Sequence, residues 1–374
     1  MHKYLLYIYI NKMRIKLRIF LVFVLVWVFS PTPASAFIGG SITPDTVFYE
    51  PGEAVQFDTI PYMVRAPYFF TAAEELSRMV EGKEPCSLKR EEYLVEWAYF
   101  DGKPDYDAFC HDIDSVAQTL RHFIRANNIQ QYRTAPNYAL LEYFTKPSSL
   151  NGNKAITYDF EDFTGSRDFS KMFVSKVMRT HTGQCTSLPL YYKILCDELG
   201  GQSALALAPN HLYVKHIGED GRWVNIELTN GHFARDVWYM ENMQISSEAV
   251  RNGVFLCALS DKETAALMLV QLINAYEQKF GQFDYFALRY ADSVLAAMPD
   301  FAPALVIKFN VHQAFGFACN DLHINPKSDF YRWNTRSFQN TMHHLDSLGY
   351  TNVPQEVYMQ TINEGRRIAE ESIQ

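Results

Sequence analysis

The amino-acid sequence predicts an α+β fold, in which a central helix that carries a cysteine packs against an antiparallel sheet, with helical regions on both sides of this core. Three observations lead to this prediction. A nearly apolar segment of helical length, 183–201, ends in a pair of glycines. Three short strand patterns follow it directly. Helical periodicity dominates residues 67–143 and the chain from 247 onward.

The composition of the 374 residues is that of a folded protein with a large core. Hydrophobic residues make up 48% and charged residues 20%, which excludes disorder as the main state. Residues 1–36 contain five of the 34 basic residues and no acidic residue, so the remaining chain carries 29 basic and 42 acidic residues, a net charge of −13. A chain this acidic is a poor candidate for binding nucleic acid through its phosphates, and we expect no such partner.

The first 36 residues have the layout of a signal peptide. A basic stretch precedes the unbroken apolar run Ile19–Phe29, and residues 34–36 have the small-x-small pattern of a signal-peptidase site. The run is shorter than the roughly 20 residues that span a bilayer, so an uncleaved anchor is the less favoured alternative. Translation from Met13 would give the basic stretch a more typical length. We therefore expect export to the periplasm or the cell exterior, without stable membrane insertion after cleavage.

A lead-in and several helices precede the predicted sheet. Residues 37–60 contain repeated glycine and proline, which indicates an extended lead-in. Apolar residues recur at helical spacing in 112–128, in 137–144 and again in 169–178. A turn-rich break at 147–153 separates the second of these helices from the third.

The cysteine-bearing helix and the strands follow in close succession. Only three charged residues interrupt the apolar surface of 183–201, so we expect this helix to be buried nearly all round. Strand patterns occupy 202–208, 211–217 and 222–228. The turn signal at 218–221 joins the last two strands into a hairpin.

The C-terminal region is predicted to be entirely helical. Residues 265–310 have the pattern of helix, turn, helix, turn, helix, and Ala287, Ala291 and Pro299 lie about where a tetratricopeptide repeat (TPR) has its small residues and its closing proline. A second, degenerate helical pair is predicted at 337–371. Because one or two repeats cannot bury their own faces, we expect this region to dock on the preceding domain and to offer a surface to a protein partner.

These patterns divide the chain into four parts, and the core among them combines a cysteine-bearing helix with strands. The four parts are a signal peptide at 1–36, an N-terminal lead-in and helical region at 37–104, the core at 105–243, and an all-α, TPR-like region at 247–374. We search the core first for chemistry, because its helix and strands contain cysteine, histidine and carboxylate residues in close succession.

All six cysteines lie after residue 36, and they are too sparse for a disulfide-stapled scaffold. No CxxC pair or zinc-finger spacing occurs, so we expect neither a structural metal site nor another cofactor. A disulfide between Cys86 and Cys110 is one option in an oxidising compartment, and the spacing alone does not decide it.

Cys185 is the candidate nucleophile, because it lies at the start of the predicted buried helix. The helix dipole and the free backbone N–H groups favour a thiolate there. Gly183 allows a tight turn into the helix, and Pro189 falls near the first turn, where a missing N–H costs little. The alternative is a buried structural cysteine without a chemical role.

Two partners for this thiol lie on the predicted strands. His211 begins one strand and Glu227 lies near the end of the next, and a nucleophilic cysteine needs such a base and a group that orients it. A three-residue loop with Gly221 in the left-handed conformation sets the pairing of the two strands: the numbers of two paired residues then sum to 440. In this register the side chains of His211 and Glu227 lie on the same face of the sheet. A two-residue loop would place them on opposite faces, and Asn225 would then be the first substitute to examine.

Three motifs in this region resemble the transglutaminase-like superfamily, which has a papain-like fold. They are GQC at 183–185, APNHLYVK at 208–215 and WVNIELT at 223–229, and the resemblance covers roughly residues 150–235. A tryptophan commonly stands four residues before the acid in that family, as Trp223 does here. The resemblance implies that Cys185 is the nucleophile, His211 the base and Glu227 the orienting acid.

The chain departs from the family pattern in one residue and differs from its animal members in spacing. Glu227 replaces the usual aspartate, and the extra methylene displaces the carboxylate by about a bond length. His211 follows Cys185 by only 26 residues, which is similar to the compact bacterial members. Those lineages include proteases, amidases, acyltransferases and members without shown activity. No calcium-loop pattern occurs, which disfavours a calcium-activated cross-linker.

The sequence supports two classes of function. The first is an exported thiol hydrolase or acyltransferase, which acts on a protein or peptide substrate through Cys185, His211 and Glu227. Its oxyanion donors would be the backbone N–H of Cys185 and, as second donor, Gln184. The alternative is a non-catalytic binding module that uses the same fold and the TPR-like tail as a scaffold. A structural zinc site ranks third, because no fourth ligand is evident.

Overall fold

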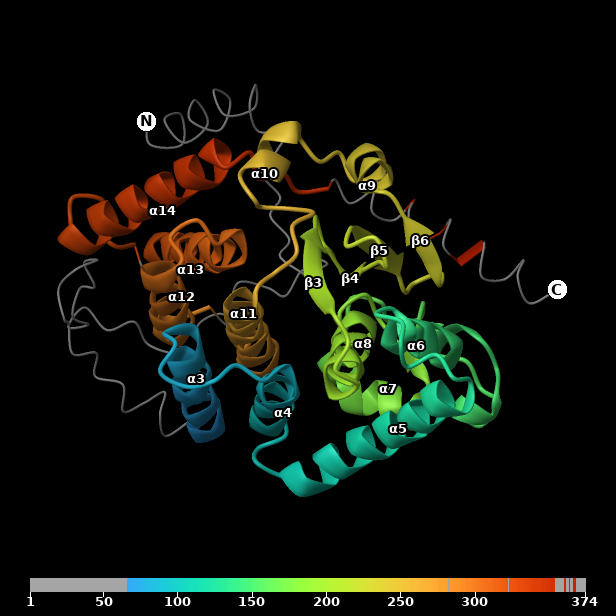
Figure 1. Cartoon of the computed structure of the whole chain (residues 1–374). Coiled ribbons are helices and arrows are strands. Elements are labelled where there is room, and N and C mark those ends of the chain that lie inside the picture. The colour runs from blue at the N-terminus through green and yellow to red at the C-terminus, as the bar shows by residue number, and fades with distance from the viewer. Residues whose placement is uncertain are drawn as a thin grey trace.

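The computed structural model describes residues 66–281, 283–321, 323–353 and four further positions, Gln360, Asn363, Arg366 and Arg367. The predicted signal peptide at 1–36 and the extended lead-in at 37–60 lie outside these residues. Among the described residues, no helix combines the length and the apolar character needed to cross a bilayer. The described chain is α+β and mostly helical, with small sheets, as the sequence predicts (Figure 1).

The chain from residue 67 to residue 180 is mainly helical. The longest helix of this part, α5, begins after Asp105, whose side chain accepts a hydrogen bond from the N–H of Ala108 at 2.8 Å. Its apolar residues are buried at intervals of three and four, which is why it lies flat on the core. The elements are α3 (Pro67–Val80), α4 (Leu88–Tyr99), α5 (Tyr106–Ala126), α6 (Ala135–Thr145), the 3₁₀ helices η2 (Ser149–Asn151) and η3 (Phe169–Met172), and α7 (Val174–Thr180).

The cysteine-bearing helix, α8 (Ser187–Glu198), is buried on every side from its first residue to Cys196. It ends at a glycine pair, and Gly200 adopts the left-handed conformation with φ +69°, as is usual after a helix C-terminus. The antiparallel sheet follows in the order β3 (Ser203–Ala208), β4 (His211–Ile217), β5 (Trp223–Glu227), β6 (His232–Ala234). A separate pair of two-residue strands, β1 (Thr157–Tyr158) and β2 (Thr182–Gly183), is parallel.

The register of the β4–β5 hairpin confirms the prediction from the turn. Val214 faces Ile226 and Ile217 faces Trp223, so the numbers of paired residues sum to 440. The loop closes through a bond from the N–H of Gly218 to the carbonyl of Arg222 at 2.9 Å. Gly221 has φ +78°, the left-handed conformation that a three-residue hairpin loop requires.

The C-terminal helices pack on the N-terminal helices and on the sheet. Figure 1 shows α11 between α3 and α4 on one side and β3 on the other. The segment before α11 also runs along β3. The N–H of Leu256 donates to the carbonyl of Leu207 at 2.9 Å, and the N–H of Leu259 donates to the carbonyl of Leu205 at 2.8 Å. This segment therefore covers the edge strand of the sheet. The helices are α9 (Asp236–Asn242), α10 (Ser247–Arg251), α11 (Asp261–Phe280), α12 (Tyr285–Ala297), α13 (Ala302–Asp321) and α14 (Asp329–Ser347).

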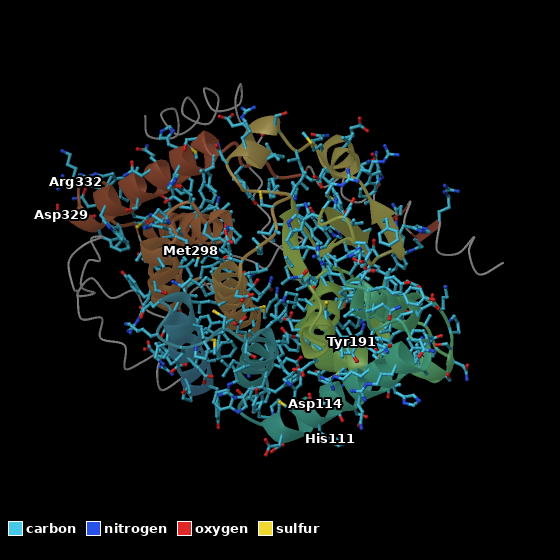
Figure 2. The ribbon with its side chains drawn as sticks, viewed as in Figure 1. His111, Asp114, Tyr191, Met298, Asp329 and Arg332 are labelled. Carbon is cyan, nitrogen blue, oxygen red and sulfur yellow. The ribbon has the colours of Figure 1, made fainter. Side chains whose placement is uncertain are left out.

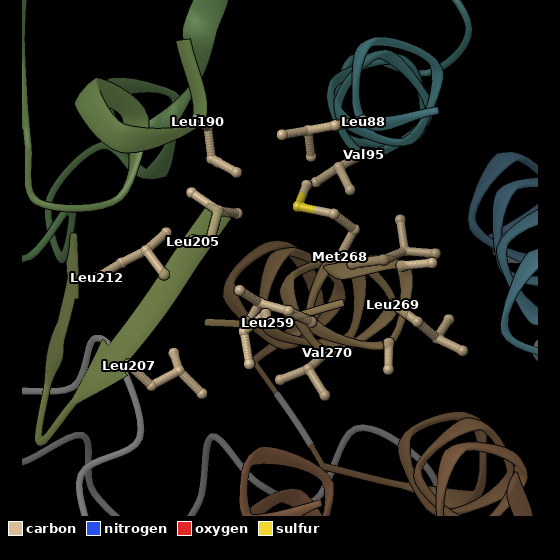
Figure 3. Packing of buried hydrophobic residues seen from close by; sticks show 14 of the residues in the cluster. Leu88, Val95, Leu190, Leu205, Leu207, Leu212, Leu259, Met268, Leu269 and Val270 are labelled. Atoms are coloured by element: carbon tan, nitrogen blue, oxygen red, sulfur yellow. The ribbon is translucent and has the colours of Figure 1, made fainter. Parts of the chain in front are cut away.

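One buried apolar cluster joins the parts that the sequence separates. Figure 3 shows side chains of the sheet, of α8, of α4 and of α11 converging on the same space. Leu205 and Leu212 come from the sheet, Leu190 from α8, Val95 from α4 and Met268 from α11. Ala287 and Ala291, which the repeat pattern singled out, are fully buried on α12. The helical region is thus docked through a shared core, which holds the sheet and α8 in fixed positions.

Candidate functional site

The loop that carries Cys185 is fixed by backbone pairing on its N-terminal side. Helix α7 ends at His181, which has a left-handed φ of 55°, and the chain then pairs with β1. The N–H of Asp159 donates to the carbonyl of Gly183 at 2.8 Å. The prediction that the helix begins at residue 183 is therefore wrong, because the backbone there takes part in strand pairing, and α8 begins only at Ser187. Cys185 precedes the helix by two residues and still lies near its positive end.

Gly183 is required by the closeness of its neighbours and not by its backbone conformation. A Cβ atom at this position would lie 2.6 Å from a methyl group of Leu188 and 2.8 Å from one of Val177. Both neighbours are buried side chains that pack the start of α8 against α7. Only glycine leaves room for the strand pairing that positions Cys185.

We expect Gly183→Ala to lower the free energy of unfolding by about 1–3 kcal/mol, as overpacking of a buried site usually does. Urea unfolding followed by circular dichroism measures this change. The matched control is Gly316→Ala in α13, where a new Cβ would lie 3.7 Å from its nearest neighbour. That control should leave stability unchanged or raise it, since alanine favours a helix over glycine. Equal stability of the Gly183→Ala variant and the unchanged protein would contradict the argument from close contact.

The hairpin register brings His211 and Glu227 together. Nε2 of His211 lies 2.6 Å from Oε2 of Glu227, and both side chains are almost completely buried. The carboxylate accepts three further hydrogen bonds: from the N–H of Thr229 at 3.0 Å, from its hydroxyl at 2.7 Å, and from the hydroxyl of Tyr239 at 3.0 Å. A carboxylate with this many donors is held as an anion in a fixed orientation.

The electrostatics of the two groups favour an ion pair. Burial alone would lower the pKa of His211, but the charge of Glu227 and the interactions of the imidazole with the Cys185 and Glu227 side chains outweigh it and raise this pKa to about 10. Burial would raise the pKa of Glu227, yet the charge of His211 and the hydrogen bonds from His211 and Thr229 hold it below its ordinary value. His211 is therefore an imidazolium at neutral pH.

Cys185 is the third member of this group. Its side chain lies beside the His211 imidazole and is one cause of the raised pKa of that group. Because Nε2 is committed to Glu227, Nδ1 is the nitrogen that remains for the sulfur. The structure thus brings together the three residues that the sequence singled out, with histidine between cysteine and acid.

Tyr239 is a member of the site that the sequence analysis missed. It lies on α9, stacks on Tyr213 with ring centroids 4.3 Å apart, and places its hydroxyl on Glu227. No periodicity marked this short helix, and the tyrosine becomes significant only because α9 folds back over the sheet. Asn225, the named substitute for the acid, instead donates to Asp236 at 2.7 Å and has no bond to His211.

Gln184 combines complete burial with an unused amide. Both its side-chain nitrogen and its side-chain oxygen lack hydrogen-bond partners in the part of the chain that the structure describes. Its backbone N–H donates to the hydroxyl of Ser187 at 3.0 Å, which fixes the loop just before Cys185. The assignment of Gln184 and of the Cys185 backbone N–H as oxyanion donors stays a prediction, since the stabilised oxygen belongs to a substrate.

The other cysteines and histidines have different surroundings. His216 lies on the opposite face of the sheet, beside Phe233 at 6.1 Å, and burial lowers its pKa. Cys86 and Cys110 are free thiols, as are the other cysteines of the described chain. Over the same residues, no cluster of three or more histidine, cysteine or acidic side chains could hold a metal ion.

Comparison of the chain with protein-family models, curated proteins and solved structures finds no significant match.

Proposed function

We propose that this protein is an exported thiol enzyme of the transglutaminase-like type, which transfers an acyl group or hydrolyses an amide or peptide bond. The observation that carries the proposal is the buried ion pair of His211 and Glu227 beside Cys185. Burying an ion pair costs several kcal/mol of desolvation. A buried pair without a chemical role would therefore add little to the stability of the fold, which favours a catalytic role for this one. The basic, apolar and small-residue pattern of residues 1–36 supports the export.

The geometry supports a separate role in the reaction for each of the three side chains. The imidazolium of His211 favours Cys185 as a thiolate, which is the nucleophilic form of the thiol. The sulfur would attack the carbonyl carbon of the substrate, and the C–N bond would break as Nδ1 of His211 gives its proton to the leaving amine. The thioester would then be resolved by water or a second amine, which returns a proton to His211.

Glu227 and its partners would orient the base and do not react themselves. The carboxylate holds His211 through Nε2, and Thr229 and Tyr239 hold the carboxylate. This arrangement keeps Nδ1 directed at the sulfur throughout the reaction. It also lets a glutamate hold the histidine at the position where the transglutaminase-like superfamily usually has an aspartate.

The tetrahedral oxyanion needs donors that carry no other bond. The amide nitrogen of Gln184 is buried and unpartnered, and it belongs to the residue next to Cys185. The N–H of Cys185 lies near the N-terminus of α8, where the helix dipole favours negative charge. Both properties support the assignment of these two groups as donors.

The experiment that tests this function is covalent labelling with a peptidyl acyloxymethyl ketone, a probe that reacts with catalytic thiolates. We expect the probe to label one site in the full chain, and Cys185→Ala to abolish this labelling. Cys257→Ser is the matched control, because Cys257 is the exposed cysteine of the described chain. His211→Ala should lower the labelling rate by about 10²-fold or more, as the loss of a general acid–base group does. Labelling that persists in Cys185→Ala would favour the binding-module alternative.

A further inference from the structure

A cavity with unusual chemistry lies at the far end of α8 from Cys185. It encloses about 260 Å³ where the beginnings of α4 and α11 meet the last turn of α8. Its lining includes Cys86, Glu91, Lys193, Asp197, Asp261 and Thr264. The residues of α8 that line the cavity begin at Lys193, six residues after the start of that helix, about 9 Å at 1.5 Å per residue. The cavity is therefore distinct from the site at Cys185.

Glu91 gives the cavity an unpartnered carboxyl oxygen. Its Oε1 accepts the N–H of Ser87 at 2.9 Å, in the first turn of α4. Its Oε2 is buried without a hydrogen-bond partner, although only 1% of the residue is exposed. A buried polar atom without a partner is costly, so this oxygen indicates a group that is added from outside.

The charges around Glu91 show what kind of group would fit. The two lysines of the lining are already paired: Lys193 lies 2.5 Å from Asp197, and Lys89 lies 2.6 Å from Glu198. Within the described chain, neither Glu91 nor Asp261 takes part in an ion pair. The lining thus holds two carboxyl groups, those of Glu91 and Asp261, that its lysines do not pair with. The missing partner is positively charged.

We propose that this cavity binds a small organic cation with primary ammonium groups, which donates a hydrogen bond to Oε2 of Glu91 and pairs with Asp261. A metal ion fits less well, since no three histidine, cysteine or acidic side chains of the described chain are grouped so that they could hold one. An aliphatic diamine matches these two carboxyl groups in number once the bound cation has ionised Glu91. Its apolar chain would pass between Thr264 and the stem of Lys193.

The protonation of Glu91 provides a readout of this binding. Burial is the main cause that raises the pKa of Glu91, to about 8, and the hydrogen bond from Ser87 and the charge of Lys193 oppose the increase. The negative charges of Asp261 and Asp197 raise it further. Glu91 is thus mostly protonated at pH 7, and a bound cation would ionise it. Binding should release a proton and should strengthen as the pH rises toward 8.

Other groups near the cavity do not account for this proton. Lys89 and Glu198 face it as an ion pair, and Lys193 and Asp197 form another. The pKa of the Cys86 thiol is raised by burial and by the negative charges of Glu91 and Asp261, so this thiol stays protonated near neutral pH.

The experiment is isothermal titration of the full chain with 1,4-diaminobutane at pH 7, in two buffers of different ionisation enthalpy. We expect saturable binding with release of close to one proton. Glu91→Gln keeps the acceptor for Ser87, and it should weaken binding about tenfold or more, equivalent to about 1.4 kcal/mol, and abolish the proton release. Asp261→Asn should weaken binding without abolishing the proton release.

Two controls separate this site from unspecific attraction to an acidic protein. Asp329→Asn removes an exposed carboxylate on α14 and should leave binding unchanged. Figure 2 shows Asp329 at the left edge of the molecule, away from Asp114, which pairs with Lys89 of the lining. Neutral 1,4-butanediol should not bind. No saturable binding of the diamine, or equal binding by the unchanged protein and Glu91→Gln, would overturn the proposal. Neither result depends on the activity of Cys185.

Discussion

Replacing Glu227 by alanine is expected to lower the free energy of unfolding by about 3–5 kcal/mol, because the change leaves a buried imidazolium without its counter-charge. The pair is nearly inaccessible to solvent, and Oε2 of Glu227 lies 2.6 Å from Nε2 of His211. Thr229 and Tyr239 would also lose the acceptor for their hydrogen bonds. In the variant, His211 would lose its proton, and this would recover part of the lost free energy of unfolding.

The pH dependence of this effect follows from the two pKa shifts. The pKa of Glu227 is lowered in the folded protein, so its contribution is present above about pH 4.5 and is lost as the pH falls through the folded value. The pKa of His211 is raised to about 10, so its contribution is complete below about pH 6.5 and is lost as the pH rises toward 10. The difference in stability between the unchanged protein and Glu227→Gln should therefore be largest between about pH 4.5 and 6.5.

Urea unfolding across this pH range measures the stability difference, and NMR titration of His211 measures its pKa. In Glu227→Gln the pKa of His211 should fall to or below its ordinary value, since burial is then opposed by less negative charge. Glu241→Gln is the matched control, because Glu241 lies exposed on α9. Equal loss of stability at pH 5 and pH 10 would show that Glu227 acts through packing and not through its charge.

The site was predictable from sequence to the extent that it depends on local rules. The loop with Gly221 in the left-handed conformation determines the hairpin register, and the register determines that His211 and Glu227 share a face. The beginning of α8 was not predictable in this way. It depends on the pairing of Thr182 with Thr157, a contact between two-residue strands that have no periodicity of their own.

Tyr239 shows the second limit of the sequence argument. Its hydroxyl reaches Glu227 only because α9 folds back onto the sheet, and no local sequence pattern predicts this packing. In the sequence the residue therefore looks like an ordinary aromatic residue. The unpartnered oxygen of Glu91 was equally hidden, because it depends on the meeting of α4, α8 and α11. Local turn and helix signals predict registers and element types, whereas pockets and supporting residues follow from tertiary packing.

The largest chemical contrast is expected between two cysteines of the same segment, Cys185 and Cys196. Burial is the main cause that raises the pKa of Cys196 to about 11, and Asp197 adds to it. Each pH unit below the pKa lowers the thiolate fraction tenfold, so about one Cys196 in 10⁴ is ionised at pH 7. Cys185 lies near the opposite, positive end of α8 and beside the positively charged His211, an environment that is typical of reactive thiols.

Alkylation by iodoacetamide between pH 5 and 9, with each site followed by mass spectrometry, tests this contrast on the folded protein. We expect Cys185 to react at pH 6 at a rate on the order of 100-fold or more above that of Cys196, which should stay unmodified until the protein is unfolded. Exposed Cys257 serves as an internal reference, because the reagent can reach it in the folded protein. Cys185 is buried, so access opposes its labelling, and a rate at pH 6 above that of Cys257 would identify an activated thiol. A Cys185 rate that follows the Cys257 profile, or labelling of Cys185 and Cys196 only together on unfolding, would count against catalysis and favour the binding module.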